Sequence, residues 1–275
     1  MPLTPSRTRS LLESLGHRPR KDLGQNFLVD GNIVQKSLAL AAVGRGDHVV
    51  DVGPGLGTLT TALLDAGARV HAVEFDPRLA QHLRETLGEN ERLSLVEADA
   101  VERPLGDWTG AAGGDFKIVA NLPYAITSPW LEKVLTGPLP STLVLMLQKE
   151  AADRLAATPG GKHFGALAVF LQAAYRVAGT HRVSRPCFYP VPDVDSVLLH
   201  LERLPAPRRF PEATRQAIRR LFTQRRKQLG GLVKAEAGLA KWLDAAVAHG
   251  VTPHMRAEAV PLAAWRLLAS QEVAL

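Results

Sequence analysis

Three glycines, Gly53, Gly55 and Gly57, follow a buried apolar run that contains Asp51. Glycine is needed where the backbone must approach a ligand without a Cβ in the way. Here the spacing is G-x-G-x-G, whereas a dinucleotide-binding turn carries G-x-G-x-x-G with the pyrophosphate at a helix N-terminus. Such turns also occur without a ligand, but this spacing fits a cofactor that lacks phosphates better than it fits a dinucleotide.

Two acids follow later strand-like runs. Glu74 comes after VHAV, about 20 residues beyond the glycines, where an acid accepts hydrogen bonds from ribose hydroxyls. Asp99 comes after LVEA and is suited to accept from an adenine amino group. Either acid alone also fits a surface residue that caps the next helix. Together with the glycine turn they predict an acid-lined pocket, which suits a cationic sulfonium and indicates S-adenosylmethionine as the cofactor.

The segment Asn121-Leu122-Pro123-Tyr124 ends a further strand-like run. The lone pair of a purine amino group is delocalised, which makes that nitrogen a poor nucleophile. Hydrogen bonds to the Asn121 side-chain oxygen and the Leu122 carbonyl, held open by Pro123, favour a pyramidal nitrogen. Tyr124 is expected to stack on the base and to align that nitrogen with a methyl donor. The alternative is an ordinary turn in which Tyr124 fills the core.

Phe188 lies in a second aromatic segment, FYPVP, followed by DVDS. We expect its ring to supply the opposite face of a base sandwich for an adenine splayed out of RNA. The alternative is a proline-rich loop with Phe188 in the core. Cys187 is the only cysteine, which excludes an internal disulfide and a cysteine-based zinc site. The nine histidines show no metal-ligand spacing, so no metal is expected.

The elements that position these residues are short β-branched runs alternating with helical stretches. Strands are predicted at residues 48–53, 70–75, 94–99, 116–122, 142–148 and 196–201, and crossover helices at 58–66 and 77–87. Such alternation implies parallel βαβ units, and therefore an α/β, Rossmann-like fold. Prolines at 205, 207 and 211 mark a composition break, after which helices are predicted at 213–228, 239–248 and 262–270.

The chain is therefore expected to hold two domains, a cofactor-binding domain over residues 1–206 with a basic N-terminal arm and a small all-α domain over residues 207–275. Between residues 203 and 234, ten lysines and arginines stand against one glutamate, and between residues 1 and 21 five stand against one. This charge predicts contacts with RNA phosphates, although a solvated helix face is the alternative. The expected RNA-binding residues are Arg219, Arg220, Arg225, Arg226 and Lys227.

Composition limits the class of protein. The chain has 275 residues, 46% of them hydrophobic and 22% charged, which excludes disorder and collagen-like repeats. No apolar run reaches the roughly 18–20 residues of a membrane helix, and the N-terminus does not resemble a signal peptide. We expect a cytoplasmic monomer without a membrane partner.

Eight segments resemble, in order, the small-subunit ribosomal RNA adenine N6,N6-dimethyltransferases, the kasugamycin-sensitivity family. They are residues 21–30 (KDLGQNFLVD), 51–60, 73–76, 121–124, 148–150 (QKE), 188–196, 224–227 (QRRK) and 256–258 (RAE). The resemblance implies a class I methyltransferase sheet, mostly parallel with a reversed last strand. It implies transfer of four methyl groups to two adjacent adenines in the 3′-terminal hairpin of small-subunit rRNA, within an immature subunit. It also adds Asn26 and Leu28 as cofactor contacts beside Gly53, Gly55, Glu74, Asp99 and Asn121.

After QRRK the family continues with an Arg-Asn-Ser-Leu type run, whereas this chain has Gly230 and Gly231, which we expect to break or hinge the helix. Two other functions remain as alternatives. One is a large-subunit rRNA adenine dimethyltransferase of the macrolide-resistance type, against which the FYPVPDVDS and RAE segments argue. The other is a non-catalytic RNA-binding assembly factor, which would not need an intact segment 121–124.

Overall fold

The computed structural model describes residues 4–20, 23–110, 115–234, 236 and 239–269. Lys21 of the basic arm, most of the glycine-rich stretch 110–114 and Ser270 of the last predicted helix lie outside these residues. No helix of the described chain is long and apolar enough to cross a membrane.

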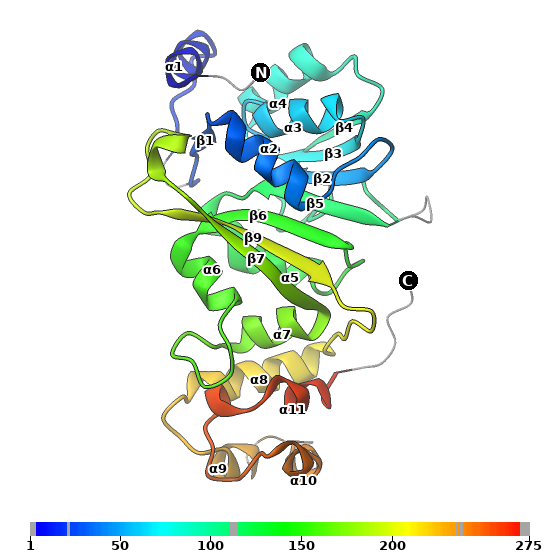
Figure 1. Ribbon diagram of the computed structural model, residues 1–275, viewed down its shortest axis with the longest axis vertical. Coiled ribbons are helices and arrows are strands. Elements are labelled where there is room, and N and C mark those ends of the chain that lie inside the picture. The colour runs from blue at the N-terminus through cyan, green and yellow to red at the C-terminus, as the bar shows by residue number, and fades with distance from the viewer. Residues whose placement is uncertain (1–3, 21–22, 111–114, 235, 237–238, 270–275) are drawn as a thin grey trace. The chain divides into compact units, whose positions relative to one another are not determined.

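Seven strands of the described chain form one sheet in the order β4-β3-β2-β5-β6-β9-β7 (Figure 1). They are β2 (His48–Val52), β3 (Arg69–Glu74), β4 (Leu93–Glu97), β5 (Phe116–Asn121), β6 (Thr142–Gln148), β7 (Tyr175–Val183) and β9 (Ser196–Arg203). Neighbouring strands from β4 to β6 run parallel, whereas β9 is antiparallel to β6, with Gln148 opposite Ser196. The mostly parallel sheet with a reversed strand confirms the predicted fold class.

Strand β7 was not predicted from the sequence. Its residues, YRVAGTHRV, are mostly half-buried or exposed, and the strand lies at the edge of the sheet. An edge strand with charged side chains lacks the continuous apolar run that identifies the central strands.

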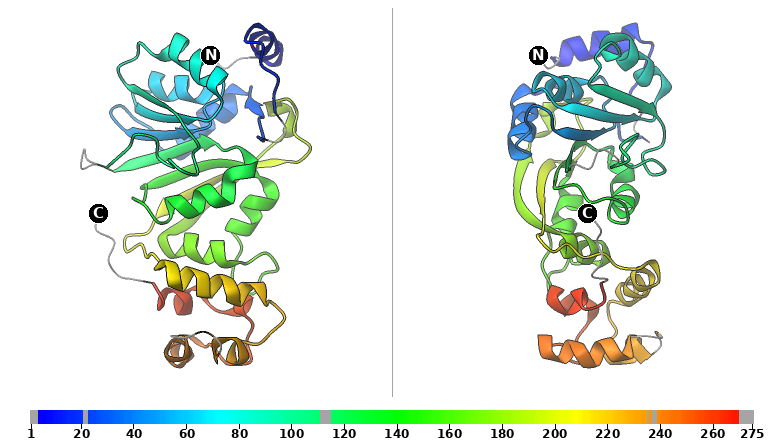
Figure 2. Two further views of the ribbon diagram at one scale, coloured as in Figure 1. Left: turned by 180° about the vertical axis from the view of Figure 1, so that it is seen from behind. Right: turned by 90° about the vertical axis from the view of Figure 1, so that its right-hand side faces the viewer.

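Helices cover both faces of this sheet. The helix α2 (Gly31–Leu40) lies on the face seen in Figure 1, and α5 (Thr127–Val134) lies on the face seen from behind in Figure 2. The other α-helices before residue 160 are α1 (Pro5–Ser14), α3 (Thr58–Asp65), α4 (Pro77–Leu87) and α6 (Lys149–Leu155). A two-residue strand β1 (Phe27–Leu28) pairs antiparallel with β8 (Phe188–Tyr189).

Side-chain caps begin three of these helices, and the Thr4 hydroxyl accepts from the backbone of Arg7 at the start of α1. The Asp30 carboxylate accepts from the backbone of Asn32 at the start of α2, and the Asp76 carboxylate accepts from that of Arg78 at the start of α4. One apolar cluster contains several completely buried side chains, including those of Val49, Leu63, Val70, Val119 and Val144. The predicted β-branched runs thus form the core that supports the strand ends.

The chain divides into two compact units. The first comprises the residues up to Ala152 together with Val177–Glu202, and the second comprises Asp153–Arg176 and the residues from Arg203 on. The sequence analysis assigns Asp153–Arg176 to the first domain, whereas the contacts group it with the C-terminal helices. The boundary at 206–207 stays a prediction about which segments fold as independent domains.

The second unit contains α7 (Ala166–Ala174), α8 (Glu212–Thr223), α9 (Leu229–Lys234), α10 (Ala240–Ala246) and α11 (Leu262–Arg266). Trp242 stacks on Trp265 with ring centroids 4.9 Å apart, and Phe222 lies 5.7 Å from Trp265. The Trp242 indole donates to the carbonyl of Ala264 at 2.8 Å, which satisfies its buried N–H.

The paired glycines correct one expectation. Helix α8 ends at Thr223, before the glycines, and Gly230 and Gly231 lie within α9 and do not break a helix. The Gly230 N–H donates to the Pro253 carbonyl at 2.8 Å, and a Cβ on Gly230 would lie 3.0 Å from the Pro253 Cβ. Glycine at this position therefore permits a close approach of two backbone segments.

At the amino ends of the strands, two histidines are packed against an aromatic side chain. His48 Nδ1 lies 3.1 Å from His71 Nε2, and the His48 and His71 rings lie 4.5 and 5.1 Å from the ring of Trp108. Burial lowers the pKa of His48 and the pKa of His71, because the charged imidazolium loses solvation. Folding therefore disfavours the charged form of both rings.

This cluster predicts acid sensitivity. Since the unfolded chain binds a proton at these rings near pH 6.5 and the folded chain resists it, the free energy of unfolding falls as the pH drops below 6.5. Replacing His71 with Phe should reduce this slope in urea titrations at a series of pH values. Replacing the exposed His181 with Phe is the control. An unchanged slope in His71→Phe would contradict the conclusion that these histidines cause the loss of stability in acid.

Candidate functional site

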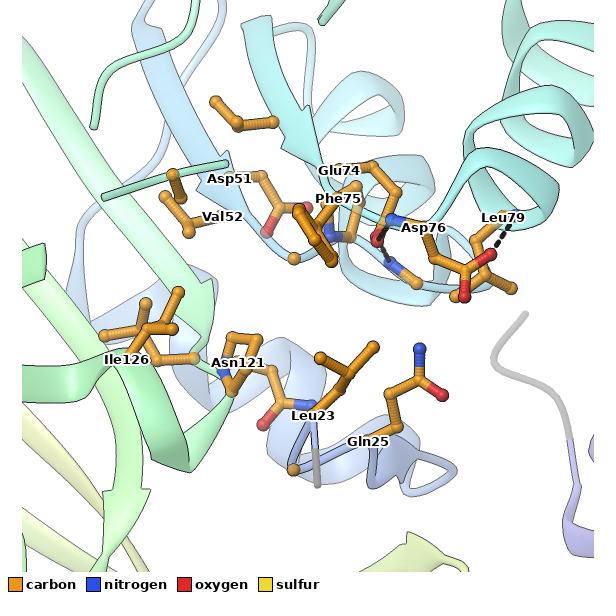
Figure 3. Close-up of a pocket in the computed structure, with 18 of the residues that line it drawn as sticks. Leu23, Gln25, Asp51, Val52, Glu74, Phe75, Asp76, Leu79, Asn121 and Ile126 are labelled. Atoms are coloured by element: carbon orange, nitrogen blue, oxygen red, sulfur yellow. Dashed lines mark hydrogen bonds between the residues drawn. The ribbon is translucent and has the colours of Figure 1, made fainter. Parts of the chain in front are cut away.

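Residues from several motifs line one cavity at the carboxyl ends of β2, β3 and β5. Asp51, Glu74 and Asn121 come from the ends of these three strands (Figure 3). Tyr124, which follows β5, also lines the cavity. The lining also includes Asn26, Leu28, Gly53, Gly55 and Asp99. Because carboxyl ends of parallel strands meet at one sheet edge, this is where open α/β sheets bind ligands. All the predicted cofactor-contact positions are therefore gathered around one space.

Glu74 holds two parts of the cavity wall together. One carboxylate oxygen accepts from the backbone of Gly55 and the other from that of Asp76, each at 2.9 Å. The side chain is buried, and this burial raises the pKa of Glu74 against the opposing effect of the two N–H groups. The carboxylate thereby fixes the glycine turn relative to the start of α4.

Asp51 is a site residue that the sequence analysis placed only at the end of a strand. It is 1% exposed, and its Oδ2 accepts from the Thr60 hydroxyl at 2.7 Å. Its Oδ1 is buried without a hydrogen-bond partner among the described residues. Burial raises the pKa of Asp51 to about 7. The only sequence signal for it is an acid within an otherwise apolar strand, VVDVG.

The glycine turn passes close to two other motifs. Gly53 and Gly55 have φ of 68° and 60°, which side chains rarely tolerate. A Cβ on Gly53 would lie 3.0 Å from the ring of Pro123, and one on Gly55 would lie 3.0 Å from the ring of Phe27. The turn therefore needs glycine both for its conformation and for these contacts.

The N-terminal segment forms another wall. Asn26 and Leu28 line the cavity, and the Asn26 carbonyl accepts from Asn121 Nδ2 at 2.9 Å. This bond uses one N–H of Nδ2 and fixes the orientation of the amide, whose only acceptor, Oδ1, can then accept a hydrogen bond from a ligand.

The segment after β5 lines the cavity. Leu122 is buried, Pro123 precedes a short 3₁₀ turn that begins at Tyr124, and all of them belong to the lining. The Tyr124 hydroxyl lies 2.6 Å from the hydroxyl of Ser196, at the start of β9, and this hydrogen bond holds the ring. Burial raises the pKa of Tyr124, which favours the neutral phenol.

Asp99 and Phe75 also line the cavity. Asp99 Oδ1 accepts from the backbone of Val101 at 2.7 Å. Phe75 is 55% exposed although it is a large apolar side chain, and it lines the same space. The sequence analysis did not single out Phe75, because a phenylalanine that ends a strand looks like a core residue.

The structure does not bring Phe188 into the cavity. The ring is 1% exposed and packs in the core cluster with residues such as Leu28 and Val34. This is the core placement that the sequence analysis kept as the alternative. A stacking role for Phe188 requires β8 to move and stays a prediction.

Three of the five predicted RNA-binding residues pair with carboxylates of the second unit. The pairs are Arg219–Glu212 at 3.6 Å, Arg220–Glu236 at 2.5 Å and Arg225–Glu258 at 3.5 Å. Arg225 also donates to the carbonyl of Lys162 at 2.7 Å. These side chains therefore hold the helices and turns of the unit, whatever else they bind.

Arg226 and Lys227 differ from these three. Both are exposed, and neither has an acidic partner among the described residues. They are the two residues of the predicted set whose charge is available to a phosphate. No group of three or more histidine, cysteine, aspartate or glutamate side chains in the described chain is arranged to hold a metal ion.

The fold resembles two solved RNA-modifying enzymes. A dimethyladenosine transferase from Plasmodium falciparum matches with a TM-score of 0.70 and 24% identity over 88% of this chain and 95% of that one. The 23S rRNA methyltransferase ErmE matches with a TM-score of 0.66 and 27% identity over 88% of this chain and 98% of that one. The sheet is thus that of a class I methyltransferase.

The sequence comparisons are closer. The chain is 57% identical to the ribosomal RNA small subunit methyltransferase A of Opitutus terrae, over 99% of this chain and 100% of that protein. It is 42% identical to the protein of the same name from Phenylobacterium zucineum, over 95% and 90% of the two chains. The family described as ribosomal RNA adenine dimethylase matches residues 16–271. With the strand-end cavity and the segment Asn121–Tyr124 in place, we conclude that the chain belongs to the ribosomal RNA adenine dimethylase family.

Proposed function

We propose that this enzyme dimethylates the N6 amino groups of two adjacent adenines in the 3′-terminal hairpin of small-subunit rRNA, with S-adenosylmethionine as methyl donor. The observation that carries the chemistry is that Asn121 and Tyr124 line the same cavity as the acids Asp51, Glu74 and Asp99. The choice of small-subunit rRNA rests on the full-length likeness to small subunit methyltransferases A. In this proposal the substrate is an immature small subunit, and the enzyme acts as a monomer in the cytoplasm.

The cavity suits S-adenosylmethionine in charge and in shape. Its described lining includes Asp51, Glu74, Asp76 and Asp99 and no lysine or arginine, which favours a cation with hydroxyl donors over a pyrophosphate. The buried, unpartnered Oδ1 of Asp51 lacks a donor that a ligand ammonium group would supply. Gly53 and Gly55 line the cavity with backbone alone and carry no side chain. These features support the fit of the cofactor.

Each lining residue has a role in this proposal. Glu74 binds ribose hydroxyls, Asp99 accepts from the adenine amino group, and the exposed ring of Phe75 covers the adenine face. Asn26 and Leu28 close over the cofactor together with Gly53, Gly55 and Asn121. When bound, the cofactor supplies a methyl group on a positively charged sulfur.

The residues after β5 prepare the acceptor. Asn121 Oδ1 and the Leu122 carbonyl accept hydrogen bonds from the substrate amino group, which draws the nitrogen lone pair out of conjugation with the ring. Tyr124, held by Ser196, stacks on the base and limits its position to one in line with the donor. The nitrogen loses a proton to water after each transfer, so the chain needs no general base.

The central experiment measures transfer of labelled methyl groups to undermethylated small subunits, to large subunits and to DNA. We expect label in small subunits only. Label in large subunits would instead support the macrolide-resistance type of activity, and binding without label would support a non-catalytic assembly factor.

Replacing Asn121 with Ala should reduce turnover by about a hundredfold or more, because an acceptor aimed at the reacting amine is lost. Binding of small subunits, measured by co-sedimentation, should be unchanged. The control is Asn32→Ala, which alters an exposed residue of α2 outside the cavity lining. Turnover that is equal in Asn121→Ala and in the control would remove Asn121 from the mechanism.

The raised pKa of Asp51 predicts that cofactor binding depends on pH. In the free protein the carboxyl takes up a proton below about pH 7, and a cationic ligand favours the ionised form. The affinity for S-adenosylmethionine in calorimetric titrations should therefore fall by up to about tenfold per pH unit below 7. Asp51→Asn should remove this dependence, whereas the exposed Asp65→Asn should retain it. A pH-independent affinity in the unaltered protein would contradict this role.

Arg226 and Lys227 should contact phosphates. Replacing both with Ala should reduce the slope of log binding constant against log salt by about 1.5, since each phosphate contact contributes about 0.7–0.9. Arg220→Ala, in which a paired arginine is removed, should change the slope less. If filter-binding measurements instead show a larger change of slope in Arg220→Ala, Arg226 and Lys227 belong to a solvated helix face and do not contact phosphates.

A further inference from the structure

Helix α1 packs its apolar side against the wall of the cofactor cavity. Leu12, which is 2% exposed, belongs to a small apolar cluster with Phe27, Leu56 and Leu79. These three partners all line the cavity, and they come from β1, the glycine turn and α4. The family match begins at residue 16, so α1 lies outside it.

His17, three residues after the end of α1, makes polar contacts with two sides of the cavity. His17 Nε2 lies 3.0 Å from the Gln25 side-chain oxygen, and Nδ1 lies 3.7 Å from a carboxylate oxygen of Asp76. Gln25 and Asp76 both line the cavity, from the N-terminal segment and from the start of α4 (Figure 3). The guanidinium of Arg78 on α4 also donates to the carbonyl of Gly16.

The same helix contacts the strand that pairs with the N-terminal segment. Arg9 Nε donates to the Tyr189 hydroxyl at 3.2 Å, and its guanidinium lies 5.6 Å from the centre of that ring. Tyr189 is opposite Phe27 in the β1–β8 pair. Helix α1 therefore bridges α4 on one side and β8 on the other.

The part of the N-terminal segment that precedes Leu28 has few contacts of its own that would keep it over the cavity. Leu28 packs in the main core cluster, and the next residue, Val29, donates its N–H to the carbonyl of Cys187. The two-residue strand pair is weak, and before it the Asn26 carbonyl accepts from Asn121. The buried Leu12 and the hydrogen bond between His17 and Gln25 add contacts at Phe27 and Gln25 themselves.

We propose that α1 and His17 form a positioning element of the cofactor site, which holds residues 25–28 closed over the cofactor. They do not line the cavity and do not contact the reacting atoms; they act through Phe27, Gln25 and Asp76. The nature of the ligand rests on the proposed function, whereas the positioning role rests on the contacts of α1.

The test compares cofactor affinity with turnover. In the full chain, His17→Ala and Leu12→Ala should each raise the Kd for S-adenosylhomocysteine, measured by calorimetry, by about tenfold, the loss expected for one buried contact. At saturating S-adenosylmethionine, kcat should change less than twofold, since the groups after β5 are untouched. His17→Gln, which places a donor near the position of Nε2, should restore most of the affinity.

Two controls separate positioning from general loosening. Ser10→Ala alters the exposed side of α1, and Leu135→Ala removes a leucine that is 4% exposed at the end of α5, away from the cavity lining. Ser10→Ala should leave Kd unchanged, and Leu135→Ala should lower the melting temperature without changing Kd.

The outcomes are distinguishable. Unchanged Kd in both His17→Ala and Leu12→Ala, or an equal rise in Leu135→Ala, would overturn the positioning role while leaving the proposed function intact. A fall in kcat at unchanged Kd would overturn it as well. Failure of the unaltered protein to bind S-adenosylhomocysteine would overturn both proposals.

Discussion

Two carboxylates buried at neighbouring strand ends are the constraint around which the site is built. Burying an acid is unfavourable unless hydrogen bonds compensate, and Glu74 meets this condition with the backbone N–H groups of Gly55 and Asp76. The same bonds set the position of the glycine turn against α4. Asp51 is compensated on one oxygen only, by Thr60. Asp51 Oδ1 is therefore an acceptor in the cavity without a donor, and a cationic ligand rich in donors would supply one.

Segments far apart in the chain depend on this frame. Asn121 binds the backbone of Asn26, 95 residues away, and Tyr124 binds Ser196, 72 residues away. The bond of Asn121 ties the end of β5 to the N-terminal segment. The bond of Tyr124 ties the turn after β5 to the start of β9, which lies beyond β6 in the sheet. Under the proposed function, the fold thus holds Asn121 and Tyr124 in place before a substrate arrives, which is the preorganisation that positional catalysis requires.

Much of the fold and of the cavity follows from local patterns. The parallel strands are apolar runs, and Glu74, Asp99 and Asn121 are recognisable because each polar residue ends such a run. What was missed or left open depends on tertiary context. Strand β7, which was missed, is polar because it lies at an edge. The choice between the two placements of Phe188 depends on its packing in a cluster with Leu28 and Val34. The ion pairs of Arg220 with Glu236 and of Arg225 with Glu258 join residues 16 and 33 positions apart, a spacing that carries no signal in the sequence.

A crystal structure with S-adenosylmethionine and an adenine-containing fragment of the rRNA hairpin tests the account most directly. We expect the ribose at Glu74, the ammonium group at Asp51 and the methyl carbon directed at an adenine amino nitrogen that is held by Asn121 beneath the ring of Tyr124. A donor bound outside this cavity, or an adenine stacked elsewhere with its amino group turned away from Asn121, would contradict it.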